Sequence, residues 1–217
     1  MAGNRNNEIW VFLSHSNKDK EKVLTSESGK FIIDGKGIVQ RFEPSEDNPF
    51  IDDAAVVDSN RTYKIDKSIR TFIVPEGVKG FASDFMRGTQ VVERFELSEG
   101  LISIGNNSFD IEKECHCVFA NCILPEVVIP QSVQEIGNFA FGHSQIDMLQ
   151  IPATLHSPYG RQFKDSHIRK LRLPKEWKDD VELGDYNELR LKGHRFNDER
   201  YGYLRCPSTT IETLEFY

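Results

Sequence analysis

The stretch from Ile129 to Phe141 reads Ile-Pro-Gln-Ser-Val-Gln-Glu-Ile-Gly-Asn-Phe-Ala-Phe, and its apolar spacing recurs along the chain. Two alternating apolar residues followed by proline stand at Val127–Pro130, Leu149–Pro152 and Leu171–Pro174. These copies are 22 residues apart, and related copies with a 23-residue step stand at Phe72–Pro75 and Phe95–Ser98. A fixed period in the twenties is typical of stacked repeat units, each of which buries its apolar face against its neighbours.

Four apolar positions recur at similar offsets in successive units. The first ends the expected strand, at Val74, Leu97, Ile129, Ile151 and Leu173. The second follows four residues later, at Val78, Leu101, Val133, Leu155 and Trp177. The third lies at Phe81, Ile104, Ile136 and Tyr159, and the fourth at Phe85, Phe109, Phe141 and Phe163. We expect these positions to form the core.

Each unit is expected to contain one short strand with one buried face, because side chains alternate at period two along a strand. Proline after the strand removes a backbone donor and keeps the strand short. Gly105 and Gly137 allow the positive φ of a tight turn. The sequence therefore predicts a mainly β solenoid, with a parallel strand on the inner face of each coil and short helical turns.

The segment Ile129–Phe141 resembles the BspA-like class of bacterial leucine-rich repeats, whose signature is Ile-Pro-x-Ser-Val-x-x-Ile-Gly-x-x-Ala-Phe. The resemblance covers roughly Arg70 to Trp177 and implies a leucine-rich-repeat solenoid that acts as a recognition scaffold. Ser98 replaces the proline, and Pro158-Tyr159 replaces Ile-Gly, so we expect these units to be distorted.

One unit is longer than the others, since the step from Leu97 to Ile129 is 32 residues. The additional residues lie in Asp110–Val118, and either Phe109 or Phe119 can fill the coil. Insertions in repeat arrays map to loops on one face, which is often the binding face.

The flanking segments predict caps. Residues 24–69 contain a hairpin signal at Asp34-Gly35, between Phe31-Ile32-Ile33 and Gly37-Ile38-Val39, and are expected to cover the first coil. The repeats are assigned to residues 70–177. Residues 178–217 are assigned to a C-terminal cap or degenerate repeat, in which Leu214-x-Phe216 resembles another repeat strand.

Residues 1–23 carry a second resemblance. Ile9 to Leu13 is an apolar stretch, followed by Ser14-His15-Ser16 and an expected polar helix start. This segment is similar to the first strand and loop of TIR signalling domains, whose bacterial members commonly cleave NAD. The match is short, and no catalytic glutamate can be assigned, so the segment is interpreted as a truncated TIR-like remnant, a fusion scar or a fortuitous match.

Residues that alternate with the buried strand positions are the candidate binding face. They form two expected columns, Arg94, Glu126, Met148 and Lys170 in one, and Glu96, Val128, Gln150 and Arg172 in the other. An apolar centre with a charged rim is typical of a modest protein interface. The alternative interpretation is that these are solvated strand positions.

Candidate reactive residues favour no catalytic or metal site. Cys115, His116, Cys117 and Cys122 are soft ligands, but Cys-x-Cys is not the usual zinc spacing. Cys122 also fits a small buried repeat position, where a free cysteine behaves as a small hydrophobe. A Cys117–His143 nucleophile has no third group to orient the base. His143, His156 and His167 are interpreted as surface loop residues, with a histidine stack in adjacent coils as the alternative, and no cofactor is expected.

Composition limits the partners. The net charge of −7 argues against a nucleic-acid partner, which requires a basic surface. No apolar run is long enough to span a membrane, and Ile9 to Leu13 is too short for a signal-peptide core. The chain as written is expected in the cytoplasm, or at the cell surface or secreted if an export signal has been lost.

The sequence thus favours a non-enzymatic module that binds a protein along its strand face. Two alternatives stay open: a TIR-type NAD-cleaving or signalling protein with a repeat sensor, and a structural or adhesive surface protein.

Overall fold

The structure is a computed structural model of residues 1–217, and it describes residues 21–51, 56–58, 61–63, 67–82, 85–86, 89–105, 118–155, 162–183, 189–191 and 209–217. These residues are mainly β, and their one helical element is the 3-10 helix η2 (Lys175–Asp180). None of the described helical structure is long and apolar enough to cross a membrane.

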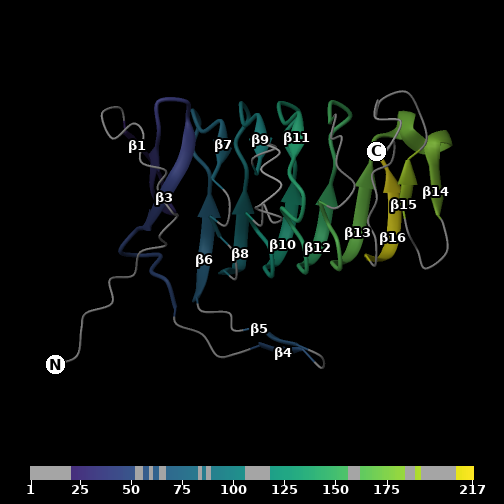
Figure 1. Ribbon diagram of the computed structural model, residues 1–217, viewed down its shortest axis with the longest axis horizontal. Coiled ribbons are helices and arrows are strands. Elements are labelled where there is room, and N and C mark those ends of the chain that lie inside the picture. The colour runs from purple at the N-terminus through teal and green to yellow at the C-terminus, as the bar shows by residue number, and fades with distance from the viewer. Residues whose placement is uncertain are drawn as a thin grey trace.

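The largest sheet that follows the repeat is parallel and has the order β10-β12-β13-β16. Its strands are β10 (Ile123–Val128), β12 (Gln145–Gln150), β13 (His167–Leu173) and β16 (Thr210–Phe216). Equivalent repeat positions face each other, because Val127 pairs with Leu149, and Leu149 with Leu171. The parallel alignment expected from the 22-residue step is confirmed (Figure 1).

Two further strands, β6 (Lys67–Ile73) and β8 (Thr89–Glu96), are also parallel, and β8 lies against β10. Short strands follow each turn: β7 (Gly80–Phe81), β9 (Ser103–Ile104) and β11 (Glu135–Ile136), with β9 and β11 paired in parallel. Figure 1 shows the long strands in one row and the short strands in another. Parallel strands at a constant step are the arrangement expected of a repeat protein.

The predicted apolar positions form the core. One cluster of buried side chains continues from Phe31 to Trp177. Val78, Leu101, Val133 and Leu155 are each 0% exposed, as is Ile136. Leu97 is only partly buried, whereas Phe109 and Tyr159 lie outside the described residues.

The coil-filling residue of the long unit is Phe119. Its ring centroid lies 5.4 Å from that of Phe141, which lies 5.4 Å from that of Phe163. Both pairs are stacked, with interplanar angles of 27° and 14°. The 22-residue spacing therefore resumes at Phe119, and the additional residues precede it.

The strand of each unit begins before the apolar-x-apolar-Pro motif and contains a further buried residue three positions ahead of it. Leu124, Ile146 and Ile168 are each at most 1% exposed and stand at this earlier position. Sequence analysis missed them because the spacing to the next buried residue is three rather than two, which breaks strict alternation.

A column of small polar residues supports the turns before these strands. The hydroxyls of Ser144, Ser166 and Thr209 donate to the carbonyls of Phe119, Phe141 and Phe163 respectively, at 2.8, 2.6 and 2.5 Å. Ser144 Oγ also accepts from the backbone N–H of Cys122 at 3.2 Å. Cys122 occupies the preceding place in this column.

The N-terminal residues form an antiparallel sheet of β1 (Lys22–Ser26), β2 (Gly29–Ile33) and β3 (Ile38–Pro44). The hairpin expected at Asp34-Gly35 is β2–β3, with Phe31 opposite Phe42. Lys22 and Val23 begin β1, so the helix expected there is wrong for these two residues. The boundary placed after residue 23 therefore falls inside a strand that pairs with β2.

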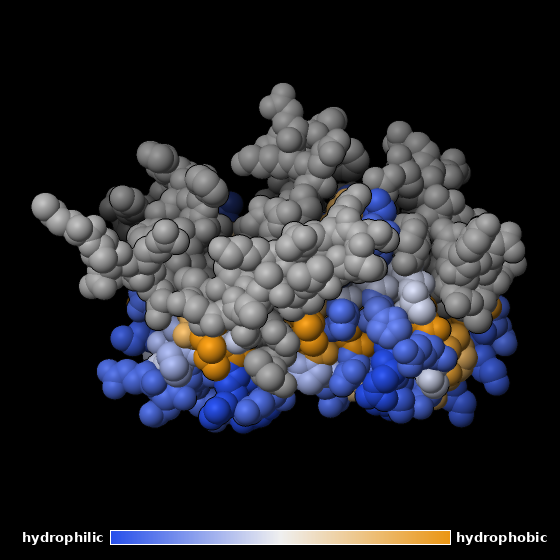
Figure 2. Space-filling model, turned by 90° about the horizontal axis from the view of Figure 1, so that it is seen from below, coloured by the Kyte–Doolittle hydropathy of each residue, from blue (hydrophilic) through white to orange (hydrophobic). Residues whose placement is uncertain are grey.

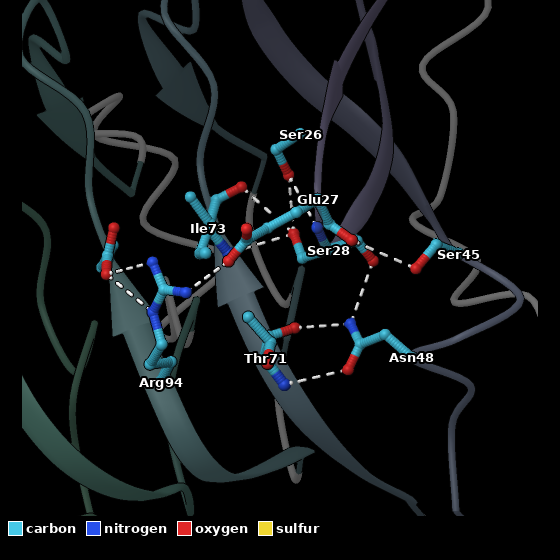
Figure 3. Close-up of polar contacts among 9 residues, drawn as sticks. Ser26, Glu27, Ser28, Ser45, Asn48, Thr71, Ile73 and Arg94 are labelled. Carbon is cyan, nitrogen blue, oxygen red and sulfur yellow. Dashed lines mark hydrogen bonds and ion pairs between the residues drawn. The ribbon is translucent and has the colours of Figure 1, made fainter.

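The cap contacts β6 through side chains that satisfy its backbone (Figure 3). Ser28 Oγ donates to the Ile73 carbonyl at 3.1 Å and accepts from the Ile73 N–H at 3.0 Å. Asn48 Nδ2 donates to the Thr71 carbonyl at 2.7 Å, and Asn48 Oδ1 accepts from the Thr71 N–H at 3.0 Å. Ile51 forms an isolated antiparallel bridge with Ser68. Because an exposed strand edge is prone to pair with other chains, these contacts protect β6.

The remaining strands are short antiparallel pairs. β4 (Val56–Asp58) pairs with β5 (Arg61–Tyr63), and β14 (Val181–Leu183), which follows η2, pairs with β15 (Leu189–Leu191). The chain then returns to the main sheet in β16, where Leu214 and Phe216 pair with Leu171 and Leu173. The repeat strand expected at Leu214-x-Phe216 is therefore present.

Candidate binding face

The strand face consists of the outward-facing residues of β6, β8, β10, β12, β13 and β16. Pairing aligns those of β10, β12, β13 and β16 in columns. Glu126, Met148, Lys170 and Thr213 are register partners in the first column. Val128, Gln150, Arg172 and Glu215 are register partners in the second. On β8, Arg94 and Glu96 are paired with Thr71 and Ile73 of β6.

The three-residue spacing in each strand widens this face. Between the buried Ile146 and Leu149, both Asp147 and Met148 point outward, and Arg169 and Lys170 do so on β13. Asp147 and Arg169 were missing from the predicted face because strict alternation never places two consecutive residues on the same side of a strand.

Ion pairs cross the C-terminal strands of the face. Arg169 Nε lies 3.3 Å from Asp147 Oδ1, and Lys170 Nζ lies 2.9 Å from Glu215 Oε1. Glu215 Oε2 also lies 3.8 Å from Arg172 Nε. On the same side, His167 Nε2 lies 2.9 Å from Glu212 Oε1. Arg169, Lys170 and Arg172 of β13 are therefore already paired with carboxylates on the neighbouring strands.

Ion pairs also occupy the N-terminal strands. Arg94 donates to Glu96 from Nε and from an Nη atom, at 2.9 and 2.7 Å, and forms an ion pair with Glu27 of the cap (Figure 3). The hydrogen bond to Glu96 and the nearby carboxylates raise the pKa of Arg94 above its usual value. Arg70 Nε lies 3.0 Å from Glu93 Oε1. Arg94 thus links the cap to the strand face.

The centre of the face differs from both ends. Val128 is 41% exposed, which makes it one of the few exposed large hydrophobic residues, and Met148 is half-buried beside Glu126. Gln150 Oε1 accepts from Arg172 at 2.7 Å. Glu126 is exposed and has no ion pair or hydrogen-bond partner for its carboxylate among the described residues. An apolar area formed by Val128 and Met148, with the unpaired carboxylate of Glu126 beside it, therefore lies between two sets of ion pairs on the described face.

Hydrophilic residues gather along one long side of the described part of the molecule, with separate hydrophobic areas behind them (Figure 2). This view is taken from below Figure 1, and among the coloured atoms the hydrophobic areas are separate rather than continuous.

Only some of the candidate reactive residues lie in the described part of the chain. Cys122 is buried, at 1% exposed, and its Sγ lies 3.5 Å from the Met86 carbonyl, as expected of a small core residue. Cys115, His116, Cys117 and His156 lie outside the described residues, as does the Ser14-His15-Ser16 motif. Over the described ranges, no three His, Cys, Asp or Glu side chains converge as a metal site would require. His143 lies on a turn, with Nδ1 3.7 Å from Asp165 Oδ2.

Residues 111–182 match the family model of the BspA type leucine rich repeat region, in 6 copies. This part of the chain includes β10, β12 and β13, and the match supports the resemblance found at Ile129–Phe141. No curated protein and no solved structure matches the chain. The family match does not include the TIR-like segment.

Proposed function

We propose that this chain is a leucine-rich-repeat solenoid that binds another protein along its strand face. The residues assigned to this role are Arg94, Glu96, Glu126, Val128, Met148, Gln150, Lys170 and Arg172. The observation that carries the proposal is the alignment of these side chains on β10, β12 and β13 in two columns, with exposed Val128 at the centre and ion pairs toward both ends of the face.

The buried core beneath the strand face supports this role. Each outward residue is adjacent to a side chain of the continuous core, such as Val127 or Leu149, which are both 0% exposed. The ion pairs hold Lys170 and Arg172 toward Glu215. Side chains fixed before binding lose less conformational entropy when a partner docks, which favours affinity.

The family match supports a binding role over a catalytic one, because repeat scaffolds use extended surfaces for recognition. Fold alone does not establish function, so the proposal depends on the face and not on the repeats.

The proposal is tested by partner capture with matched variants. Immobilised wild type is compared with Val128→Asp/Met148→Asp, which places two carboxylates in the centre of the face. The control is Gln134→Asp/Thr154→Asp, which makes the same charge change at two exposed turn residues. We expect proteins retained by wild type and control, and quantified by mass spectrometry, to be lost from the face variant. Retention that is equal in all three contradicts binding along this face.

A further inference from the structure

The charges of the strand face are almost completely paired. Its described carboxylates are Glu93, Glu96, Glu126, Asp147, Glu212 and Glu215. Four of them have a lysine or arginine partner within 4 Å: Glu93, Glu96, Asp147 and Glu215. A fifth, Glu212, lies 2.9 Å from the imidazole of His167. Only Glu126 has no side-chain partner among the described residues, although Lys170 stands in the same column. Lys170 and Arg94 both point to other carboxylates.

Glu126 lies beside the apolar part of the same face. Met148 is its register partner on β12, and neighbouring strands lie about 4.8 Å apart. Val128 lies two residues along β10, which places it about 7 Å away on the same side of the sheet. The carboxylate and two apolar side chains therefore form a patch that one long side chain can cover.

Arginine has the chemistry that fits this patch. Its guanidinium pairs with a carboxylate through two parallel hydrogen bonds, and its aliphatic stem covers apolar surface. Covering Val128 and Met148 also excludes water from the ion pair and strengthens it. Arginine is among the residues that contribute most to binding at protein interfaces.

The overall charge favours the same partner. The net charge of −7 attracts a basic segment at long range and raises its association rate. On the strand face, Arg70, Arg94, Arg169, Lys170 and Arg172 already lie close to carboxylates, so they do not repel such a segment strongly. An acidic partner has no corresponding free cation on the described face.

We propose that Glu126, with Val128 and Met148, forms a subsite that receives an arginine flanked by apolar residues from a partner protein. This inference rests on the proposed function, and it specifies the chemistry of the partner at the centre of the face. The other charged residues of the face then set the boundary of the contact.

The subsite is tested with two synthetic peptides, acetyl-Gly-Val-Arg-Val-Gly-amide and the same peptide with citrulline in place of arginine. Citrulline keeps the size and shape of arginine but has no charge. Methyl signals of Val128 and Met148 are followed by NMR as each peptide is added at millimolar concentrations. We expect saturable shifts and an affinity about three- to tenfold higher for the arginine peptide.

Two variants with the same net charge separate a local contact from general attraction. Glu126→Gln is expected to bind both peptides equally, because the charge that distinguishes them is gone. Glu99→Gln removes an exposed carboxylate outside the strands and is expected to keep the preference for arginine.

Three results overturn the subsite. They are no shift at Val128 and Met148, equal binding of both peptides by wild type, or equal loss of the preference for the arginine peptide in Glu126→Gln and Glu99→Gln. Equal binding with clear shifts at Val128 and Met148 means that the face binds ligands without an arginine preference, so the proposed function survives. The proposed function fails on a separate result: in the capture experiment, the Val128→Asp/Met148→Asp variant retains the same proteins as wild type.

Discussion

The N-terminal cap and the repeats around Phe141 stabilise their strands by different means. In the repeats, each strand pairs with the backbone of the next, and the same hydroxyl recurs at Ser144, Ser166 and Thr209. In the cap, the backbone of β6 is satisfied by the side chains of Ser28 and Asn48, which occur once. A repeat can therefore tolerate a change at one polar position better than the cap can, because neighbouring units supply equivalent contacts.

The largest effect is expected from a charge in the repeat core. Ile136→Asp places a carboxylate at a position that is 0% exposed, and we expect the free energy of unfolding to fall by more than about 4 kcal/mol. Gln150→Asp adds the same charge on the strand face, beside Arg172, and should change stability by less than about 0.5 kcal/mol. Urea unfolding followed by circular dichroism measures both. Equal losses would contradict the assignment of buried and exposed positions.

Asn48→Ala tests the cap and is expected to cost about 2–4 kcal/mol, because the Thr71 N–H and the Thr71 and Ser28 carbonyls lose a buried partner. Asn48→Asp should be no better than alanine, since a carboxylate cannot donate to these carbonyls. The neighbouring Asp47→Ala, at an exposed position, is the control and should be nearly neutral. The same urea titration reports all three, and a loss below about 0.5 kcal/mol for Asn48→Ala would show that the cap does not depend on this side chain.

Ser166→Ala makes the corresponding test in the repeats. It removes the hydrogen bond to the Phe141 carbonyl and the acceptor for the Ser144 N–H, so we expect a loss of about 1–2 kcal/mol. Hydrogen exchange of the Ser144 amide should accelerate while the amide of Ile33 in the cap is unaffected. If Ser166→Ala destabilises the protein as much as Asn48→Ala does, the proposed difference between the two regions is wrong.

Cys122→Ser tests whether the position that precedes Ser144, Ser166 and Thr209 in the column of small polar residues also benefits from a hydroxyl. Serine is close in size to cysteine and can donate to a nearby carbonyl, such as that of Ala120, which lies 3.7 Å from Sγ. We expect stability to change by less than about 1 kcal/mol, because a better hydrogen bond offsets the loss of a more apolar group. Cys122→Val, which cannot donate, should be clearly less stable in the same thermal melt. A valine variant as stable as the serine variant would show that this position needs only an apolar side chain.

The smallest effect concerns Tyr217, which directly follows β16. Burial raises the pKa of Tyr217, and its hydroxyl donates to the Ile151 carbonyl at 2.8 Å. Glu176 raises this pKa further, whereas the hydrogen bond with Gln131 and the charge of Arg172 lower it. Because the folded-state pKa exceeds the unfolded value of about 10, this contribution is present below that pH and is lost as pH rises through the folded-state pKa. Unfolding free energies measured from about pH 8 to about pH 11 should decline less in Tyr217→Phe than in wild type. Identical pH profiles would contradict this linkage.

The sequence determined the repeat period, the parallel strands and most of the core. Apolar residues recur at the positions equivalent to Val133, Ile136 and Phe141, and such periodic burial is a local property of the chain. It also placed Glu126, Val128, Met148 and Gln150 in the correct columns. The tertiary structure alone decided that Phe119 fills the long unit, that Asp147 and Arg169 also face outward, and that Asn48 and Ser28 satisfy β6. It likewise decided that Glu126 is the unpaired carboxylate of the described face. These features depend on contacts between residues far apart in the chain, or on a local break in alternation, and neither leaves a periodic signal in the sequence.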